Sequence, residues 1–295
     1  MKVSIGIPFY NPGEVFRESI QSVLNQSFDD FELILLDDGS KDNSLTIALS
    51  FTDPRVRVVS DGKNLGLPAR LNQLIDLSRG EYIARMDADD LIHLDKLAQQ
   101  VAMLEADNSI NLVSTGICSI TNDNQVVGYR VPSIAKNSNC SVSDTIFGRV
   151  NIAHATILAR KSWYQRNRYN PDAKLMEDYQ LWLDASIKGD LAVGYLQAPV
   201  YFYREESSVS SQKAILAYKN QFNLIYQHYF SYLTWREKIQ FTGLTIIKIA
   251  VVSGLNIVKN VKKLQNLRNK QTKQDPIIIK KLQQELDKLR SFFNE

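Results

Sequence analysis

Residues 80–90 read Gly-Glu-Tyr-Ile-Ala-Arg-Met-Asp-Ala-Asp-Asp (GEYIARMDADD), and this stretch decides the fold. Residues 81–86 predict a short strand, because apolar and aromatic residues follow a glycine that ends the preceding helix. Three carboxylates, Asp87, Asp89 and Asp90, stand at its carboxyl end. Open α/β sheets bind ligands beyond this end of their strands, and carboxylate oxygens suit Mg²⁺ or Mn²⁺. The alternative is a solvated loop in which Asp89 or Asp90 caps the next helix.

Strand and helix patterns alternate on both sides of this stretch. The alternation of strands 3–8, 31–36, 56–60 and 81–86 with helices 14–26, 43–50, 68–77 and 94–105 predicts a mostly parallel, doubly wound sheet. Further on, the patterns predict strands at 112–120, 126–131, 151–160 and 200–204, a polar loop at 133–143 and a helix from 176.

The strand ends offer nucleotide-binding chemistry without the usual dinucleotide loop. No GxGxxG follows the first strand. Tyr10 could stack on a base, Asp38 could accept from a base N–H or a ribose hydroxyl, and Arg70 could meet a phosphate or the base edge. Taken singly, each has a structural alternative, since an Asp at a strand end is commonly a turn residue.

An acidic pair opens the helix that begins near residue 176. Glu177 and Asp178 fall in its first turn, where the helix dipole favours anions. They are interpreted either as a capping pair or as a general base at the rim of a pocket. His154 has two interpretations as well, a core residue bonded to the backbone or an active-site contact.

Composition places the chain among ordinary globular proteins. It has 295 residues, of which 44% are hydrophobic and 23% charged. Cys118 and Cys140 match no metal-binding spacing, and no signal peptide is recognised, so we expect reduced thiols and a cytoplasmic location.

Charge divides the chain into three parts. Residues 1–212 hold 20 Lys/Arg against 27 Asp/Glu, residues 213–274 hold 11 against 1, and residues 275–295 hold 4 against 4. We therefore expect a catalytic domain at 1–212, a basic, aromatic-rich helical region at 213–274 and a terminal amphipathic helix at 275–295. The middle part contains an apolar run, 244–258, that is too short to span a bilayer. It predicts either a helix lying on an anionic membrane or a subdomain packed on the core.

The terminal segment carries an apolar stripe at helical spacing. Its members are Ile278, Leu282, Leu286, Leu289 and Phe293. Such a stripe predicts a short coiled coil or a docking helix, and hence a homo-oligomer through this helix.

Seven motifs in order over residues 1–212 resemble the family 2 glycosyltransferases, which have the GT-A fold. They are SIGIPFYN, LLDDGSKDNS, NLGLPARLNQ, GEYIARMDADD, HATILARK, EDYQLWL and YFYREESSVS. The resemblance implies a Rossmann-like, mostly parallel α/β sheet with flanking helices, followed here by a C-terminal helical extension.

The resemblance also assigns roles to matching residues. It implies that Asp178, with Glu177 and His154 beside it, acts on the acceptor as the catalytic base, and that Asp89 holds Mn²⁺ or Mg²⁺. The residues implied to bind the nucleotide sugar are Pro8, Tyr10, Asn11, Asp38, Arg70, Asp87, Ala88, Arg204 and Ser207.

The resemblance implies transfer of a sugar from a nucleotide diphosphate sugar, expected to be a UDP-sugar, to a hydroxyl of a glycan or lipid-linked acceptor, with inversion. The chain lacks the QxxRW element of processive synthases, so we expect one sugar per event, in polysaccharide assembly at or near the cytoplasmic face of the inner membrane. Two alternatives stay open. A sugar nucleotidyltransferase would need a basic, Gly-rich loop where PFYNPG stands, and a basic nucleic-acid-binding module is disfavoured by the acidic first 212 residues, so we expect no nucleic-acid partner.

Overall fold

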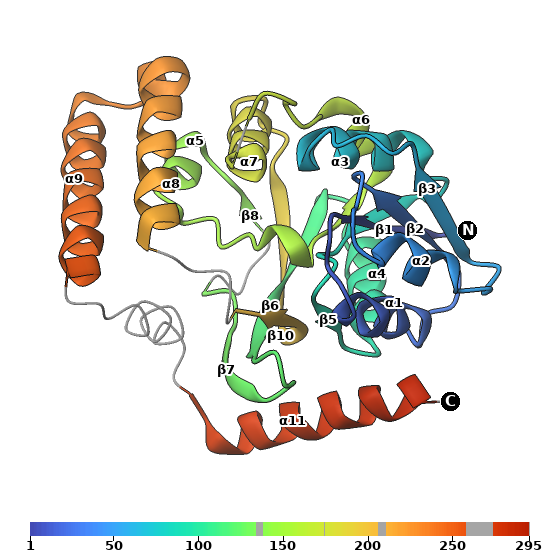
Figure 1. Cartoon of the computed structure of the whole chain (residues 1–295). Coiled ribbons are helices and arrows are strands. Elements are labelled where there is room, and N and C mark those ends of the chain that lie inside the picture. Colours follow the sequence, from blue (N-terminus) through green and yellow to red (C-terminus); the bar gives the residue numbers. More distant parts are fainter. Residues whose placement is uncertain (134–137, 174, 206–210, 258–273, 295) are drawn as a thin grey trace.

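The computed structural model describes residues 1–133, 138–173, 175–205, 211–257 and 274–294 (Figure 1). Its strands are β1 (Val3–Phe9), β2 (Phe31–Asp37), β3 (Val56–Ser60), β4 (Tyr82–Arg85), β5 (Leu91–Ile92), β6 (Leu112–Ile120), β7 (Val126–Arg130), β8 (Ser138–Asn139), β9 (Leu158–Arg160) and β10 (Ala192–Arg204). Its α-helices are α1 (Val15–Leu24), α2 (Ser44–Leu49), α3 (Leu67–Leu77), α4 (Lys96–Ala106), α5 (Val142–Ile146), α6 (Lys161–Arg166), α7 (Glu177–Ile187), α8 (Ser211–Leu224), α9 (Trp235–Ile257) and α11 (Pro276–Ser291).

One sheet organises the fold, with the strand order β3-β2-β1-β4-β9-β6-β10-β5. The first four strands of this order are parallel to one another, and β6 is parallel to β10. β9 runs antiparallel to both of its neighbours and joins the two parallel groups. The predicted α/β architecture with a mostly parallel sheet and C-terminal helices is therefore confirmed.

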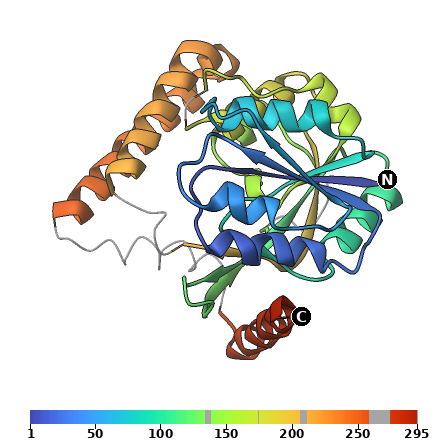
Figure 2. The same cartoon turned by 45° about the vertical axis from the view of Figure 1, so that its right-hand side comes forward.

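Helices cover both faces of the sheet (Figure 2). Apolar side chains of α1, α2 and α4 pack on one face, and those of α3, α6 and α7 pack on the other. Every residue of β2 is buried, as its uninterrupted apolar sequence requires of a strand covered on both sides. At Gly6 in β1 a Cβ atom would lie 2.1 Å from a methyl carbon of Leu74, so the glycine lets α3 approach the sheet closely.

Three local predictions are wrong. The strand predicted at 200–204 is the end of β10, which begins at Ala192. Residues 151–160 do not form one strand, because Asn151 adopts a φ of 48° and a 3-10 turn, His154–Thr156, precedes the short β9. The predicted loop at 133–143 contains β8 and the start of α5, whose first turn is capped by the Ser141 hydroxyl accepting from the Asp144 N–H at 3.0 Å. Residues 134–137 lie outside the described part.

The α8–α9 hairpin extends from the side of the molecule that carries α5 and α7 (Figure 1). Phe241 of α9 is buried with Ile225, Tyr229 and Leu183 of α7 in a small apolar cluster. A π-helical turn, Ile225–Tyr229, and a 3-10 turn, Phe230–Tyr232, connect the two helices. None of the described helices is both long and apolar enough to cross a membrane. The three domain boundaries stay predictions.

Helix α11 docks within its own chain. Leu282, Leu286 and Leu289 are buried against β5, β6, β7 and β10. The Gln21 side chain of α1 also donates to the backbone carbonyl of Phe293 at 2.8 Å. The predicted docking helix is therefore present, and most of its apolar stripe packs inside the chain, although Ile278 is 37% exposed and Ile279 takes its place in the cluster. The homo-oligomer stays a prediction.

Candidate active site

The acidic loop after β4 is held by the end of β10. The buried carboxylate of Asp90 accepts hydrogen bonds from the Tyr201 hydroxyl and from the Arg204 N–H, both at 2.8 Å. The same hydroxyl also accepts from the Asp87 N–H at 3.2 Å. Burial and the carboxylates of Asp87 and Asp89 hold the pKa of Asp90 well above its usual range. Asp90 is thus a structural anchor for this loop.

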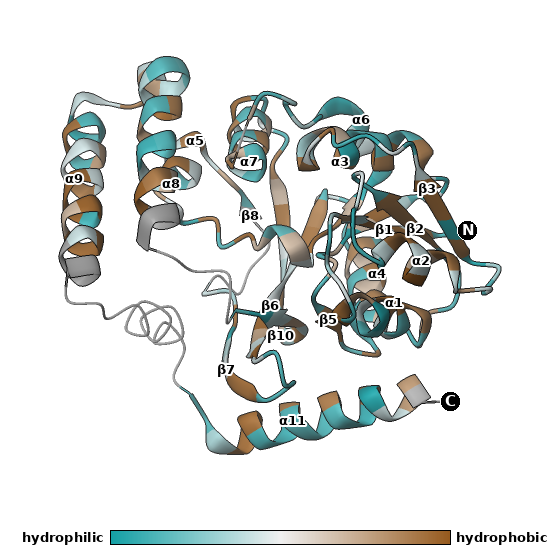
Figure 3. Cartoon of the chain, in the orientation of Figure 1, coloured by the Kyte–Doolittle hydropathy of each residue, from teal (hydrophilic) through white to brown (hydrophobic). Residues whose placement is uncertain are grey.

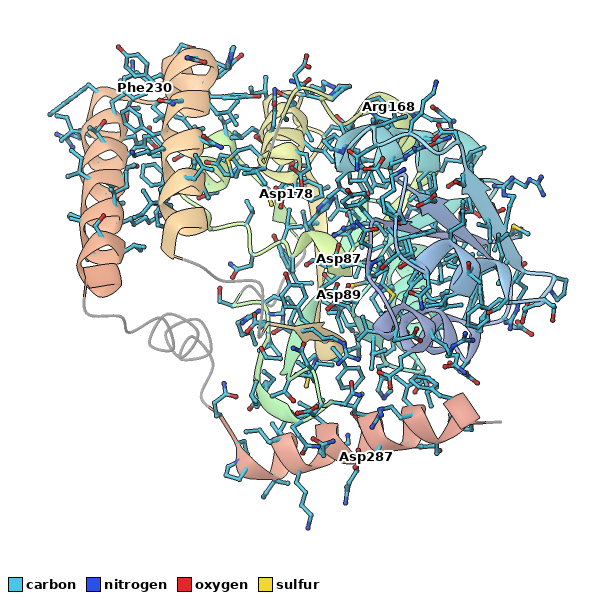
Figure 4. The ribbon with its side chains drawn as sticks, in the orientation of Figure 1. Asp87, Asp89, Arg168, Asp178, Phe230 and Asp287 are labelled. Atoms are coloured by element: carbon cyan, nitrogen blue, oxygen red, sulfur yellow. The ribbon has the colours of Figure 1, made fainter. Side chains whose placement is uncertain are left out.

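A cavity of about 540 Å³ opens beside this loop. Asp87 reaches it from the end of β4, Glu177 and Asp178 reach it from the start of α7, and His154 reaches it from the turn before β9. Figure 4 shows Asp87, Asp89 and Asp178 in the same central region of the molecule. The rest of the lining comprises Leu67, Arg85, Ile117, Arg130, Ile152, Ala153, Ala155, Tyr203 and Glu205. The fold therefore brings Asp87, His154, Glu177 and Asp178 together, whereas Asp38 and Asp89 do not line this cavity.

Arg85 is a cavity residue that sequence reasoning missed. It is only 4% exposed and forms an ion pair with Asp87, while its Nε atom is buried without a hydrogen-bond partner among the described residues. Burial opposes its charge, but Asp87 and the phenols of Tyr201 and Tyr169 outweigh that effect and raise the pKa of Arg85. A charged residue inside an otherwise apolar strand was the available signal, because a buried cation requires a partner.

The two carboxyls at the start of α7 lie in a poorly solvated place. Burial raises the pKa of Asp178, although the Tyr179 N–H donates to its carboxylate at 2.7 Å and Arg85 also favours its charge. Burial likewise raises the pKa of Glu177, with a smaller contribution from Asp178. A carboxylate whose pKa lies above the usual value is a stronger base, which suits it to accept a proton from an alcohol.

His154 is held as a neutral ring. Its Nε2 atom lies 2.8 Å from the Tyr169 hydroxyl, and its ring lies edge-on to Trp182 with a centroid separation of 6.0 Å. Burial and the nearby Arg85 charge lower the pKa of His154 well below its ordinary value. The partner at Nε2 is thus a side-chain hydroxyl and not the backbone group of the first interpretation, while the ring borders the cavity as the second interpretation requires.

Asp89 offers oxygen ligands beside this cavity. Partial desolvation and the Asp87 charge raise the pKa of Asp89, and its carboxylate has no ion pair among the described residues. No group of three or more His, Cys, Asp or Glu side chains in the described ranges could hold a metal ion. One or two carboxylates are nevertheless what Mg²⁺ commonly receives from a protein when substrate phosphates supply further oxygens, so the donor set fits that use.

The loop after β1 is tied to the loop after β2. The Asn11 side-chain oxygen accepts from the backbone N–H groups of Lys41 and Asp42 at 2.6 and 3.3 Å, and its own N–H donates to the Ser40 hydroxyl. Pro8 is half-buried at the end of β1. Tyr10 is 54% exposed, so its ring has a surface on which a base could stack.

Asp38 and Arg70 form a buried pair rather than an open binding surface. The Asp38 carboxylate accepts from Leu65 N–H at 2.7 Å, from Gly66 N–H at 3.1 Å and from Arg70 Nε at 2.9 Å. Arg70 is fully buried and also pairs with Asp61 at 2.6 Å. Arg70 therefore supports Asp38 and the loop before α3, and it presents no exposed surface for the phosphate or base contact that we predicted.

Arg204 is likewise committed to protein groups. It is 4% exposed, its Nη1 donates to the carbonyls of Thr121 and Asn122, and its Nη2 pairs with Glu18 of α1 at 2.8 Å. The carbonyl of Ala88, in the acidic loop, accepts from the Ser19 hydroxyl at 2.9 Å. Ser207, the last predicted contact, lies outside the described residues.

Known proteins resemble this chain in sequence. Residues 4–165 match the sequence model of glycosyl transferase family 2. A Bacillus subtilis protein provisionally named glycosyltransferase EpsE is 33% identical over 233 residues, which are 77% of this chain and 81% of that protein. An Escherichia coli protein, UDP-Glc:alpha-D-GlcNAc-diphosphoundecaprenol beta-1,3-glucosyltransferase WfgD, is 29% identical over 215 residues, which are 72% of this chain and 80% of that protein.

Solved structures share the fold at low sequence identity. The mannosyltransferase PcManGT from Pyrobaculum calidifontis, solved with GDP-Man and Mn²⁺, is 13% identical with a TM-score of 0.60 over 99% of this chain and 85% of that one. S. aureus TarS 1–349, solved with UDP-GlcNAc, is 18% identical with a TM-score of 0.57 over 84% of this chain and 72% of that one. The longer TarS structure is covered to 43% of its length.

Proposed function

Because this chain belongs to glycosyl transferase family 2, we propose that it transfers a single sugar from a nucleotide diphosphate sugar to a hydroxyl group, with inversion at the anomeric carbon. The donor is a UDP-sugar and the acceptor is a glycan or a lipid-linked glycan. The observation that carries the proposal is that Asp87, at the end of β4, and Asp178, at the start of α7, line one cavity. A donor held at the acidic loop would thus have a carboxylate base in the same cavity.

Asp178 acts as the general base in this proposal. The acceptor hydroxyl gives its proton to the Asp178 carboxylate while its oxygen forms a bond to the anomeric carbon. The bond between that carbon and the diphosphate oxygen breaks at the same time, and the electron pair leaves with the nucleotide diphosphate. Attack opposite the leaving group inverts the anomeric centre. Burial supports the role, because it raises the pKa of Asp178 and so strengthens the base.

The neighbours of Asp178 orient the acceptor and the donor sugar. Glu177 lines the same cavity and carries the second raised pKa. His154, held by the Tyr169 hydroxyl, can donate or accept a hydrogen bond at a sugar hydroxyl as a neutral ring. Arg85 keeps Asp87 in place by an ion pair. Because these groups line one cavity, all of them can contact sugars that are bound in it.

The nucleotide lies across the loops that follow β1, β2 and β4. Tyr10 stacks on the base, and Pro8 and Asn11 shape the loop around it. Asp87 and Ala88 face the ribose and diphosphate. Asp38 and Arg204, whose side chains are committed to protein groups, hold the loops around the nucleotide in place. Arg70 acts through Asp38, since it is fully buried. The exposed ring of Tyr10 supports this placement of the base.

Asp89, together with diphosphate oxygens, would hold Mn²⁺ or Mg²⁺. A divalent ion bound there would neutralise charge that develops on the leaving diphosphate. The oxygen donors and the absence of a competing ion pair at Asp89 within the described residues support this use.

The acceptor chemistry suggests where the protein works. A lipid-linked acceptor would hold the enzyme at the cytoplasmic face of the inner membrane, as a peripheral protein of polysaccharide assembly. Helix α9 is the part of the chain that would contact the membrane there.

Donor binding and transfer test the proposal separately. Binding of UDP-sugars is measured by the shift in melting temperature with and without Mn²⁺, since a ligand of the folded state raises it. We expect a shift with at least one UDP-sugar that is larger with Mn²⁺. No shift with any nucleotide or nucleotide sugar would overturn the proposal.

The base is tested by Asp178→Asn, with Glu177→Gln as the matched variant one residue away. Asp178→Asn should keep the nucleotide-induced shift and lose transfer by about 10²–10⁴-fold. Glu177→Gln should retain more of the activity. Normal turnover by Asp178→Asn would remove Asp178 from this role.

A further inference from the structure

Helix α9 has a wide apolar face that no other described part of the chain covers. Trp235, Ile239 and Ile246 are 67%, 65% and 62% exposed, and Ile247 and Val251 are 58% and 52% exposed. Spacings of four and seven residues put the first three on one stripe of the helix, and the other two form a second stripe about a third of a turn away from it. Figure 3 shows apolar residues along α9, and Figures 1 and 2 show the helix at the outer edge of the molecule, beyond α8.

The opposite face of α9 is already committed. Phe241, Thr245 and Val252 are buried, and the ring of Phe241 stacks on that of Phe222 of α8 at a centroid distance of 5.9 Å. Lys248 lies over the Tyr218 ring of α8 at 5.7 Å. One side of α9 is thus packed against the protein. A partner on the other side must therefore contact the helix from outside, along its exposed face.

Charge distinguishes between the occupants of such a face. Helix α9 carries Arg236, Lys238 and Lys248 against Glu237, and the sequence that follows it, 258–273, holds six Lys or Arg and no Asp or Glu. A second copy of the chain would bring like charges together, whereas an anionic lipid surface would attract them. An apolar helical face combined with basic residues is the pattern of helices that lie in the plane of the membrane interface.

We infer that the apolar face of α9 docks on an anionic membrane surface. Trp235, Ile239 and Ile246 enter the boundary between headgroups and acyl chains, while the buried side of the helix stays on the protein. The helix lies in the membrane plane and does not insert across it. The purpose of this contact rests on the proposed lipid-linked acceptor, since a membrane-bound enzyme meets such an acceptor by diffusion in two dimensions.

Flotation of the full chain with vesicles tests the inference. We expect the protein to float with vesicles of equal parts phosphatidylcholine and phosphatidylglycerol, and not with phosphatidylcholine alone, and we expect high salt to weaken the binding. The double variant Ile239→Asp/Ile246→Asp should reduce the bound fraction about ten-fold or more, because it places charges in the apolar stripe. Both substitutions change exposed positions, so its melting temperature should match that of the unmodified chain.

Leu49→Asp is the matched control. Leu49 is 63% exposed on α2, away from α9. The Leu49→Asp variant should bind vesicles like the unmodified chain. Absence of flotation with the anionic vesicles, or equal flotation of the double variant, would overturn the inference. A dimer that the double variant converts to a monomer, without vesicle binding, would assign the face to a second copy instead.

The same samples separate this inference from the proposed function. Vesicle binding is measured without substrate, and the UDP and Mn²⁺ melting shift is measured without vesicles. A melting shift without flotation contradicts only the role of α9. Flotation without any nucleotide-induced shift contradicts the proposed function and leaves the membrane contact standing.

Discussion

The guanidinium of Arg204 donates from Nε to the backbone carbonyl of Asp89 at 2.6 Å. Its Nη2 pairs with Glu18, and Arg290 of α11 pairs with the other oxygen of the same carboxylate at 3.1 Å. The last helix of the chain is thereby connected, through α1 and the end of β10, to the loop that carries the acidic cluster. The position of Asp89 depends on an ion-pair chain between elements distant in sequence.

Glu18→Gln tests that connection. The change removes the counter-charge of a guanidinium that is 3% exposed, so it should lower the free energy of unfolding by about 1–3 kcal/mol. It should also weaken Mn²⁺-dependent binding of UDP more than metal-free binding, because the loop of Asp89 loses support. Chemical denaturation and UDP titration with and without Mn²⁺ measure the two effects. Glu14→Gln, at the exposed start of the same helix, is the control, and equal effects of both variants would contradict the argument.

Asp178→Asn should make the protein more stable at neutral pH. Burial raises the pKa of Asp178 in the folded state, so the folded protein favours the protonated carboxyl more than the unfolded chain does. The contribution of this carboxyl to the free energy of unfolding is therefore fully present below the pKa that it has in the unfolded chain. That contribution is lost as the pH rises through the higher pKa that it has in the folded protein. The variant should therefore melt at a higher temperature near neutral pH, and the difference should shrink as the pH falls toward 3.8. A lower melting temperature of the variant at neutral pH would show that Arg85 outweighs burial.

Lys96→Met should also be stabilising, with a different pH dependence. Lys96 is 2% exposed, its Nζ donates to the Gln100 side chain at 2.8 Å, and burial lowers its pKa to about 7. The folded state disfavours the ammonium form of Lys96, so the residue lowers the free energy of unfolding most below pH 7. This destabilisation disappears as the pH rises toward 10.5, the ordinary pKa of a lysine. The variant should gain about 1–4 kcal/mol at acidic to neutral pH and little at pH 10. Denaturation across this range measures it, with Lys280→Met on the surface of α11 as the control, and a gain that does not vary with pH would refute the explanation.

Leu286→Ala tests the docking of α11 within the chain. Leu286 is fully buried, so the cavity left by truncation should cost about 2–4 kcal/mol. Ile277→Ala, at a position that is 78% exposed, should cost little. Both melting temperatures should be independent of protein concentration. A concentration-dependent loss in Leu286→Ala would return this helix to the oligomer interface that its apolar spacing first predicted.

Local patterns predicted some elements correctly. Strands β3 and β6 have the predicted ends, and Glu177 and Asp178 lie in the first turn of α7 as predicted. The prediction failed at 151–160, where the positive φ of Asn151 and the turn at His154 interrupt an apolar run. Apolar runs record burial, and burial alone does not distinguish a strand from a tight turn inside the core.

Binding roles were harder to predict than elements. Arg70 and Arg204 matched motif positions, yet both guanidiniums are buried in ion pairs with Asp38 and Glu18. Arg130 and Glu205, which pair at 2.7 Å beside the cavity, gave no signal in the sequence because they are far apart in it. A motif specifies a residue type at a position, but the direction of its side chain depends on the surrounding packing.

The sequence alone determined an α/β protein with an acidic loop after its fourth strand. It could do so because the features concerned are local: the order of apolar runs, the turns that end them and the carboxylates at the strand ends. Only the tertiary structure decided that Asp87 and Asp178 share one cavity, that Arg85 lines it with them, and that α11 covers its own sheet while α9 leaves an apolar face uncovered by the other described residues. The physical reason is that these relationships join segments far apart in the chain. They follow from which apolar surfaces bury one another, and that choice depends on the whole set of packed elements.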